Sequence, residues 1–241
     1  MLICIFIIVA IISAHFSYHY IEQQYSDCIA ILKKIENAAY IGRKGMGFDY
    51  YKTVQLDVEN ILQYPELPTG CEVTSLAIVL NYLGHDIDKV SLSDKFLPKG
   101  EVGKTHPDEA FIGNPRNRHS YGANAPVLIK TANDYLSHEN SIHEVHDVSV
   151  KNFDSLLEYI NDGYPVIFWG TMYMKEGWYS TKWIIDSKVV RWYAREHCMV
   201  LIGYTKDTYI IADPLQGIVE YDKDLVQQRY NELGNQAIVI Y

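Results

Sequence analysis

The order of the apolar patterns constrains the fold of this chain more than any other feature. Apolar residues recur at helical spacing in the middle of the chain, between residues 71 and 162, whereas runs of β-branched and aromatic residues dominate from residue 164 to the end. Helices followed by strands is the order of α+β proteins. We therefore expect an α+β fold in which N-terminal helices pack on an antiparallel sheet of about five or six strands.

Three helices are expected before the strands. The first opens at Cys71, directly after the breaker run Pro68-Thr69-Gly70, and has apolar residues at 73, 76, 77, 80 and 83. The second covers residues 125–137, with Pro126 at its start, and the third covers 150–162 and ends before a glycine. Between the first two lies a stretch rich in Gly, Pro and Asn, residues 91–126, which is too long for an ordinary connection.

The expected strands follow in the second half of the chain. YPVIFWGTMY (164–173) is a continuous apolar run, 181–199 is a strand or hairpin, and EHCMVLIGY (196–204), TYIIAD (208–213), GIVEY (217–221) and NQAIVIY (235–241) complete the sheet. A helix or turn is expected at 223–231. The short turn after Tyr204 favours an antiparallel hairpin between the strands on either side of it.

Cys71 is the candidate nucleophile. At the first turn of a helix the free backbone N–H groups and the macrodipole favour a thiolate. The dipole contributes only about 0.3 to 1 kcal/mol, up to about 2 when partly buried, whereas one pKa unit is about 1.4 kcal/mol. A cationic imidazole is therefore also required. Of the nine histidines, only His197 opens a strand, while the others, including His119 in the long loop, lie in polar or irregular surroundings.

Two further residues complete the expected catalytic group. Asp213 ends the strand after the one that His197 opens, so a hairpin brings its carboxylate beside the imidazole as the orienting group. Gln63 lies a few residues before Cys71. Its amide could donate to an oxyanion together with the backbone N–H of Cys71, although a loop glutamine bonded to backbone is the alternative from local sequence.

These motifs resemble the C39-like cysteine peptidase family, a branch of the papain-like superfamily. The similarity rests on LQYPELPTGCEVTSLAIVLNYLG, FIGNP, HCMVLIGY, IIADPLQG and GNQAIVIY, and it runs from about Val54 to Tyr241. The resemblance implies that Cys71 is the nucleophile, His197 the base, Asp213 its orienter and Gln63 part of the oxyanion hole. No GxxxxGK[ST] loop is present, so the leader-peptidase role of transporter-fused members is not expected.

The expected activity is peptide-bond hydrolysis on a peptide or protein substrate, through an acyl-enzyme on a Cys71 thiolate. A transpeptidase or amidase could use the same residues, and a catalytically silent surface binding module is the competing class. Tyr121 and Asn124 in the long loop, and Trp192 in the aromatic stretch before the base, are candidate substrate-binding residues. The acidic residue after the nucleophile, Glu72, is expected to satisfy the helix N-terminus.

Composition excludes several partners. The formal charge is −9, from 30 acidic and 21 basic residues, without a Lys/Arg-rich block, so nucleic acid is not an expected partner. The four cysteines form no disulfide framework. A zinc site from Cys71, His197 and Cys198 is not expected, because adjacent strand residues point to opposite faces and no CxxC spacing exists. No cofactor is expected.

The N-terminal segment indicates contact with a membrane. Residues 1–21 are predicted to be a signal peptide or membrane anchor, 22–50 a juxtamembrane helix or linker, and 51–241 the peptidase domain. The basic residues that follow the apolar segment argue for a cytoplasmic C-terminal side. We nevertheless expect an exported protein, at the cell surface or membrane-anchored, and secreted if the segment is cleaved, because the resemblance is to proteins often found there.

Overall fold

A computed structural model describes residues 53–150 and 152–241 of the chain. The expected signal peptide or anchor (1–21) and the linker (22–50) lie outside these residues, so the division of the chain into three segments stays a prediction. Within the described residues, no helix has both the length and the apolar character needed to cross a bilayer.

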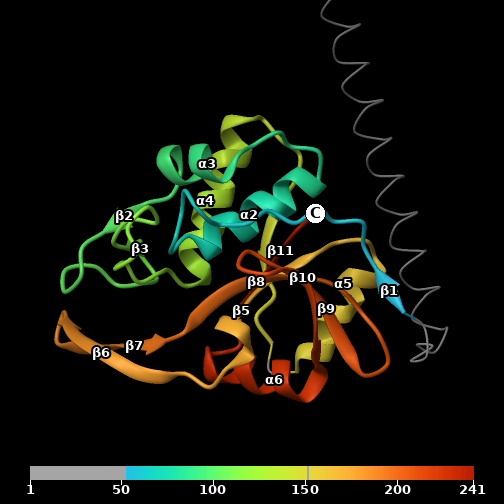
Figure 1. The fold of residues 1–241 in the computed structure, drawn as a ribbon. Coiled ribbons are helices and arrows are strands. Elements are labelled where there is room, and N and C mark those ends of the chain that lie inside the picture. Colours follow the sequence, from blue (N-terminus) through green and yellow to red (C-terminus); the bar gives the residue numbers. More distant parts are fainter. Residues whose placement is uncertain (1–52, 151) are drawn as a thin grey trace, which may run out of the picture. The chain divides into compact units, whose positions relative to one another are not determined.

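An antiparallel sheet of seven strands forms the centre of the described part, in the order β10-β9-β8-β5-β11-β4, with β1 also paired to β8 (Figure 1). The strands are β1 (Val54–Gln55), β4 (Val145–Asp147), β5 (Val166–Thr171), β8 (Glu196–Tyr204), β9 (Thr208–Asp213), β10 (Gly217–Asp222) and β11 (Ala237–Ile240). The expected α+β fold and antiparallel sheet are confirmed. The additional strands are β1 and β4, which are too short to show a sequence period.

The expected helices are also present. They are α2 (Cys71–Tyr82), α4 (Ala125–His138), α6 (Lys223–Glu232) and, in place of one helix over 150–162, the 3₁₀ turn η1 (Phe153–Leu156) followed by α5 (Leu157–Asn161). One helix, α3 (Lys89–Lys95), was not predicted and overlaps the start of the stretch expected to be a loop. It is capped by Asp88, whose carboxylate accepts hydrogen bonds from the N–H groups of Val90 and Ser91.

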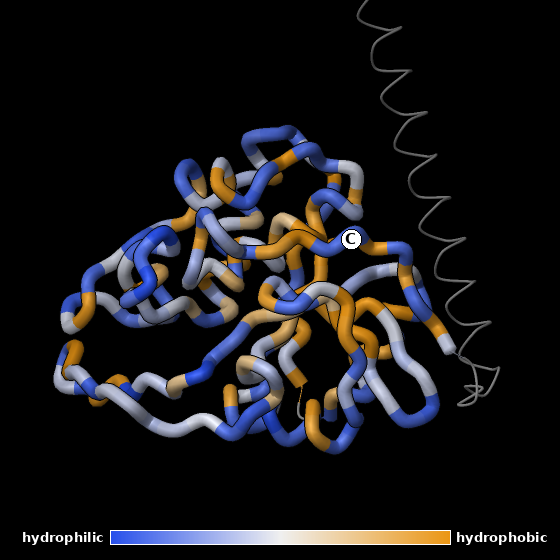
Figure 2. The backbone as a smooth tube through the Cα atoms, viewed as in Figure 1, coloured by the Kyte–Doolittle hydropathy of each residue, from blue (hydrophilic) through white to orange (hydrophobic). Residues whose placement is uncertain are grey.

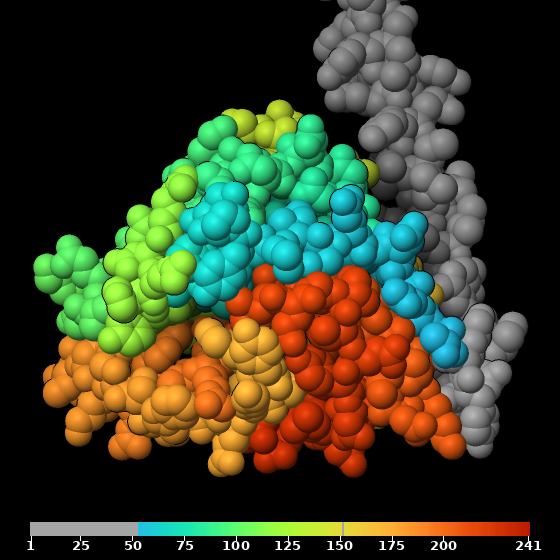
Figure 3. Space-filling model, in the orientation of Figure 1, coloured from blue at the N-terminus to red at the C-terminus, as the bar shows by residue number. Residues whose placement is uncertain are grey.

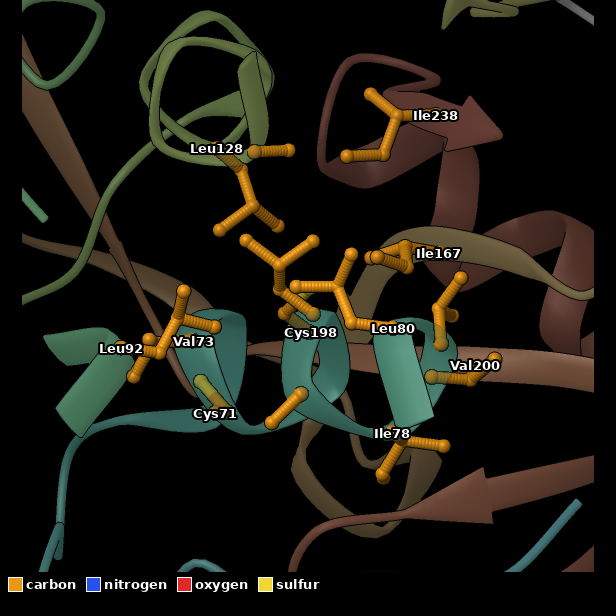
Figure 4. Close-up of a cluster of buried hydrophobic side chains, with 14 of the residues drawn as sticks. Cys71, Val73, Ile78, Leu80, Leu92, Leu128, Ile167, Cys198, Val200 and Ile238 are labelled. Carbon is orange, nitrogen blue, oxygen red and sulfur yellow. The ribbon is translucent and has the colours of Figure 1, made fainter. Parts of the chain in front are cut away.

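Two apolar clusters cover the two faces of the sheet, and the alternation of β8 separates them. On one face, Ile78 and Leu80 of α2 belong to the cluster that contains Cys198 and Val200 of β8 (Figure 4). The other face packs against η1, α5 and α6 through a second cluster that contains Met199. Hydrophobic residues, drawn in orange in Figure 2, run through the strands at the centre of the described part. Cys198 is fully buried, which confirms its predicted role as a small core residue.

A separate hairpin extends from the sheet and carries the aromatic stretch. It consists of β6 (Trp178–Ile185) and β7 (Lys188–Ala194), and it confirms the strand or hairpin expected before His197. A second small sheet, the parallel pair β2 (Lys99–Gly100) and β3 (Phe111–Ile112), was not predicted. The ring of Tyr121, in the loop after β3, packs edge to face on the rings of Trp183 and Trp192. The loop and the hairpin therefore border each other (Figure 3).

Candidate active site

Cys71 is the first residue of α2, as the sequence predicted, and its side chain is 4 % exposed. The chain turns into this helix at Gly70. A side chain there would meet Cβ of Leu67 at 2.8 Å, so the tight approach requires glycine. The Cys71 thiol donates a hydrogen bond to Oε2 of Glu72 over 3.2 Å. The candidate nucleophile is therefore hydrogen-bonded to the side chain of Glu72.

Two buried carboxylates lie beside the thiol. Glu72 is fully buried, and its Oε1 accepts a hydrogen bond of 2.6 Å from the N–H of Ala123, a contact that its expected role at the helix N-terminus did not include. Glu196, the residue before the expected base, is 7 % exposed, and its Oε1 has no hydrogen-bond partner within the described part of the chain. The sulfur of Cys71, one carboxylate oxygen of Glu72 and one of Glu196 all lie within 4.8 Å of one another. Sequence reasoning did not find this cluster.

Because Gly122 has no side chain, the carboxylates of Glu72 and Glu196 can occupy the space beside it. A Cβ atom at this position would lie 2.5 Å from Oε1 of Glu72 and 2.8 Å from Oε2 of Glu196, closer than carbon and oxygen can approach. The only sequence signal for the cluster is that each acid is a chain neighbour of a predicted catalytic residue. That signal was insufficient, because the contact also depends on where Gly122 packs.

These surroundings favour the neutral thiol of Cys71. Burial raises its pKa well above the ordinary value, and the charges of Glu72 and Glu196 raise it further, while the backbone N–H of Cys198 lowers it. Burial also raises the pKa of Glu72 to about 7, and burial followed by the charge of Glu72 raises the pKa of Glu196 well above its usual range. The sequence predicted a resting thiolate, and this arrangement of side chains favours the opposite state.

His197 and Asp213 form the predicted pair. The register of β8 and β9 brings the start of one strand near the end of the other, and His197 Nε2 lies 2.7 Å from Oδ1 of Asp213. Both side chains are fully buried. Burial alone would raise the pKa of Asp213, but hydrogen bonds from His197, Gln216 and Leu215 outweigh it and lower that pKa. The carboxylate therefore stays charged and fixes one ring nitrogen of the imidazole.

The other ring nitrogen of His197 is available for chemistry. Nδ1 is buried and has no hydrogen-bond partner among the described residues. The peptide group that follows this histidine carries the N–H of Cys198, which is near enough to the Cys71 sulfur to affect its pKa. The first turn of α2 and the start of β8 therefore meet at the sulfur. The sequence predicted that these two elements would be brought together.

Gln63 is buried beside the same site. Its backbone N–H donates to the carbonyl of Pro214, the residue after Asp213, and its Nε2 donates to the carbonyl of Pro68 over 2.8 Å. Since a side-chain amide has two N–H donors, the second remains for a ligand. Both interpretations of this glutamine are therefore compatible with the structure: it bonds to the backbone, and it lines the cavity next to Cys71.

A cavity of about 280 Å³ opens beside the thiol. Gln63 and Cys71 line it together with Tyr121 from the loop and with Trp192 and Glu196 from the hairpin and its continuation into β8. The structure therefore places two of the three predicted substrate-binding residues at the nucleophile. The predicted competitor His119 is exposed and does not line this cavity.

The third predicted substrate-binding residue, Asn124, is not among the residues that line this cavity. It is the residue before α4, where its Nδ2 donates to Asp108 and its Oδ1 accepts from Gln236. Its side-chain amide is therefore engaged in connecting the loop, α4 and the segment before β11. A role for Asn124 in substrate binding stays a prediction.

Comparison with known proteins agrees with this fold. Residues 55–238 match the model of the Peptidase_C39 like family. The uncharacterized protein YvpB of Bacillus subtilis (strain 168) is 26 % identical over 195 residues, covering 78 % of this chain and 76 % of that protein. The crystal structure of a candidate C39-like peptidase from Bacillus anthracis superposes with a TM-score of 0.70 at 30 % identity, covering 79 % of this chain and 98 % of that one. The resemblance seen in the sequence is confirmed, and the chain belongs to the C39-like peptidase family.

Proposed function

We propose that this protein is a cysteine peptidase that hydrolyses peptide bonds through an acyl-enzyme on Cys71. The observation that carries the proposal is the buried pair of His197 and Asp213, at the start of the strand that meets the thiol. The carboxylate holds Nε2, and Nδ1 has no hydrogen-bond partner in residues 53–150 and 152–241. A nucleophile, a base and an orienting group are the parts that this chemistry requires.

The first chemical step transfers the proton of the Cys71 thiol to Nδ1 of His197. Because burial and the neighbouring carboxylates raise the pKa of the thiol, the transfer starts from the neutral thiol. The sulfur then attacks the peptide carbonyl. The second N–H of the Gln63 amide and the backbone N–H of Cys71, which has no acceptor within its own helix, donate to the oxyanion.

The later steps use the same groups. The imidazolium of His197 donates its proton to the leaving amine, and the acyl group remains on sulfur as a thioester. Water then loses a proton to Nδ1 and attacks the thioester, which releases the carboxylic acid and returns the thiol. Asp213 keeps the ring in one tautomer throughout, because its Oδ1 accepts the N–H of Nε2.

The test is a search for new peptide ends. The full chain is incubated with a proteome-derived peptide library, and mass spectrometry compares the products with those of Cys71→Ala. The proposal predicts new N-termini with the wild-type chain alone and their loss in His197→Ala. Cys198→Ala is the matched control, since it removes the other buried thiol but leaves the proposed nucleophile.

Two outcomes would count against peptide hydrolysis. Equal product sets for the wild-type chain and Cys71→Ala would favour the silent binding module. Addition of a free amine acceptor to the wild-type reaction, followed by ligation in place of hydrolysis, would assign the same residues to a transpeptidase.

We also propose that the peptidase domain acts outside the cytoplasm. The support is the apolar run from Leu2 to Ala14, which lies outside the described residues. Added protease should degrade the domain on intact cells. Protection of the domain until lysis would refute export, independently of any result on catalysis.

A further inference from the structure

We propose that Cys71, Glu72 and Glu196 form a binding site for a divalent transition-metal ion of the Zn²⁺ type, which holds the nucleophile in an inactive state. The inhibition rests on the proposed peptidase function, whereas the binding of the ion does not. The ligand set is one thiolate sulfur and two carboxylate oxygens. A thiolate selects Zn²⁺, Co²⁺ and similar ions over Mg²⁺ and Ca²⁺, which prefer oxygen ligands alone.

The geometry of the three side chains fits such an ion. Zinc bonds to sulfur at about 2.3 Å and to carboxylate oxygen at about 2.0 to 2.2 Å, so neighbouring ligand atoms in a tetrahedron lie roughly 3.4 to 3.6 Å apart. The three ligand atoms here lie within 4.8 Å of one another, and Cys71 Sγ is 3.2 Å from Oε2 of Glu72. To close the set around one ion, the widest of these separations, at most 4.8 Å, has to shorten by roughly 1.2 to 1.4 Å.

A second observation points to a ligand at this place. Glu196 belongs to this cluster and is 7 % exposed, and its Oε1 has no hydrogen-bond partner among the residues that the structure describes. A buried carboxylate without a donor is costly, and a cation that binds it removes that cost. Two buried carboxylates beside one thiol likewise place several potential negative charges together, and a divalent ion offsets them.

The site is accessible, and the fourth coordination position is open. Cys71 and Glu196 both line the cavity of about 280 Å³, so an ion can enter from the cavity and keep a water molecule on that side. Glu72 closes the buried side and is held in place by the N–H of Ala123. When the ion binds, the Cys71 thiol proton and any carboxyl proton leave to solvent, and the sulfur can no longer attack a substrate carbonyl.

The test measures binding in the absence of substrate. The full chain carries Cys4→Ser and Cys28→Ser, so that the remaining thiols are Cys71 and Cys198. Titration with Co²⁺ should produce a thiolate-to-cobalt charge-transfer band in the near ultraviolet. The band should persist in Cys198→Ala and disappear in Cys71→Ser. A band that depends on Cys198, or the absence of any band, would overturn the proposal.

The affinity for Zn²⁺, compared between the wild-type chain and a variant of Glu196, tests whether this carboxylate is a ligand. Competition with a chromophoric chelator should show at least about tenfold weaker Zn²⁺ binding by Glu196→Gln, which keeps the side-chain shape. The control is His143→Ala, because Nδ1 of His143 lies 3.0 Å from Nε2 of His85, and this pair is an alternative zinc site. Loss of affinity in His143→Ala with none in Glu196→Gln would refute the assignment.

Alkylation provides a measurement that does not depend on the fold of a variant. Zn²⁺ should slow iodoacetamide labelling of Cys71 in the wild-type chain at least tenfold, and a chelator should restore the rate. Unchanged labelling at saturating Zn²⁺ would refute the site. Peptide hydrolysis that resists Zn²⁺, in a chain whose Co²⁺ band is present, would refute only the inhibition and leave the proposed peptidase function intact.

Discussion

Replacing Asp213 separates the charge of the orienting group from its hydrogen bonds. Oδ1 of Asp213 accepts from both His197 Nε2 and the Leu215 N–H, each over 2.7 Å, and Oδ2 accepts from Gln216 Nε2 over 2.8 Å. Asp213→Ala removes all three acceptor contacts in a fully buried place. Asp213→Asn keeps one oxygen, and the Leu215 N–H favours its placement at the Oδ1 position, where it still accepts from His197.

The two substitutions should differ in magnitude. An unsatisfied buried donor costs about 1 to 3 kcal/mol, and Asp213→Ala leaves the Nε2–H of His197 and the N–H of Leu215 without their acceptor, so it should lower the free energy of unfolding by about 3 to 5 kcal/mol. At about 2 to 4 °C per kcal/mol for a domain of this size, Tm should fall by roughly 6 to 20 °C. Asp213→Asn exchanges charged hydrogen bonds for neutral ones, a loss of about 1 to 2 kcal/mol. Gln216 must then turn its oxygen toward the new amide.

Denaturant and thermal unfolding of the full chain measure these differences, and cleavage of a wild-type substrate measures the catalytic effect. Asp213→Ala should abolish turnover, while Asp213→Asn should keep measurable turnover because the tautomer of His197 is preserved. Equal stability losses in the two variants, or a loss below about 1 kcal/mol in Asp213→Ala, would refute the hydrogen-bond reasoning. The structure of the Asn variant should show its amide oxygen facing Leu215.

The acid dependence of stability follows from the same group. The pKa of Asp213 is lower in the folded chain than its ordinary value, so the folded state binds its proton less tightly than the unfolded state. Its contribution is present above the ordinary pKa and is lost as the pH falls through the folded pKa. The free energy of unfolding should therefore decline more steeply between about pH 5 and pH 2 in the wild-type chain than in Asp213→Asn. Parallel pH profiles would contradict this.

Three other substitutions test the cavity. Gly122→Ala should destabilise the fold by about 1 to 3 kcal/mol, since its Cβ would overlap the Glu72 carboxylate; an unchanged Tm would mean that the two acids move freely. Gln63→Ala should lower kcat by about 100-fold or more with little change in KM, and a change in KM alone would exclude an oxyanion contact. Trp192→Ala should raise KM. Trp178→Ala is the control and should not raise KM, because Trp178 is 54 % exposed and does not line the cavity. Equal effects of the two substitutions would refute a role for Trp192 in substrate binding.

The sequence predicted those elements whose local signals are strong. The breaker before Cys71 and the helical spacing after it correctly placed the start of α2, and the apolar run of β5 was equally clear. Short elements such as α3 and β4 were missed or not separated, because a few residues show no reliable period. The pairing of His197 with Asp213 was predictable, since a short turn joins their strands.

The carboxylates beside the thiol were not predictable in the same way. Glu72 meets the backbone of Ala123, about fifty residues away, and the space for both acids exists because Gly122 has no side chain. The preference of Cys71 for its neutral form follows from its burial first and from the charges of Glu72 and Glu196 second. Local arguments from the helix dipole could not include them, because they consider one turn of one helix.

The pairing of β5 with β8 sets Gly170 opposite His197 and Trp169 opposite Cys198. Since neighbouring strand residues face opposite sides, deleting one residue in the corner before β8, so that the strand slides by one place along β5, would set Cys198 opposite Gly170 and His197 opposite Thr171. The cysteine would then take the place of the candidate base, and the imidazole would take the place of Glu196 on the other face of the strand. The register of β8, as well as the identity of its residues, must therefore be preserved in any insertion, graft or chimera made at that corner.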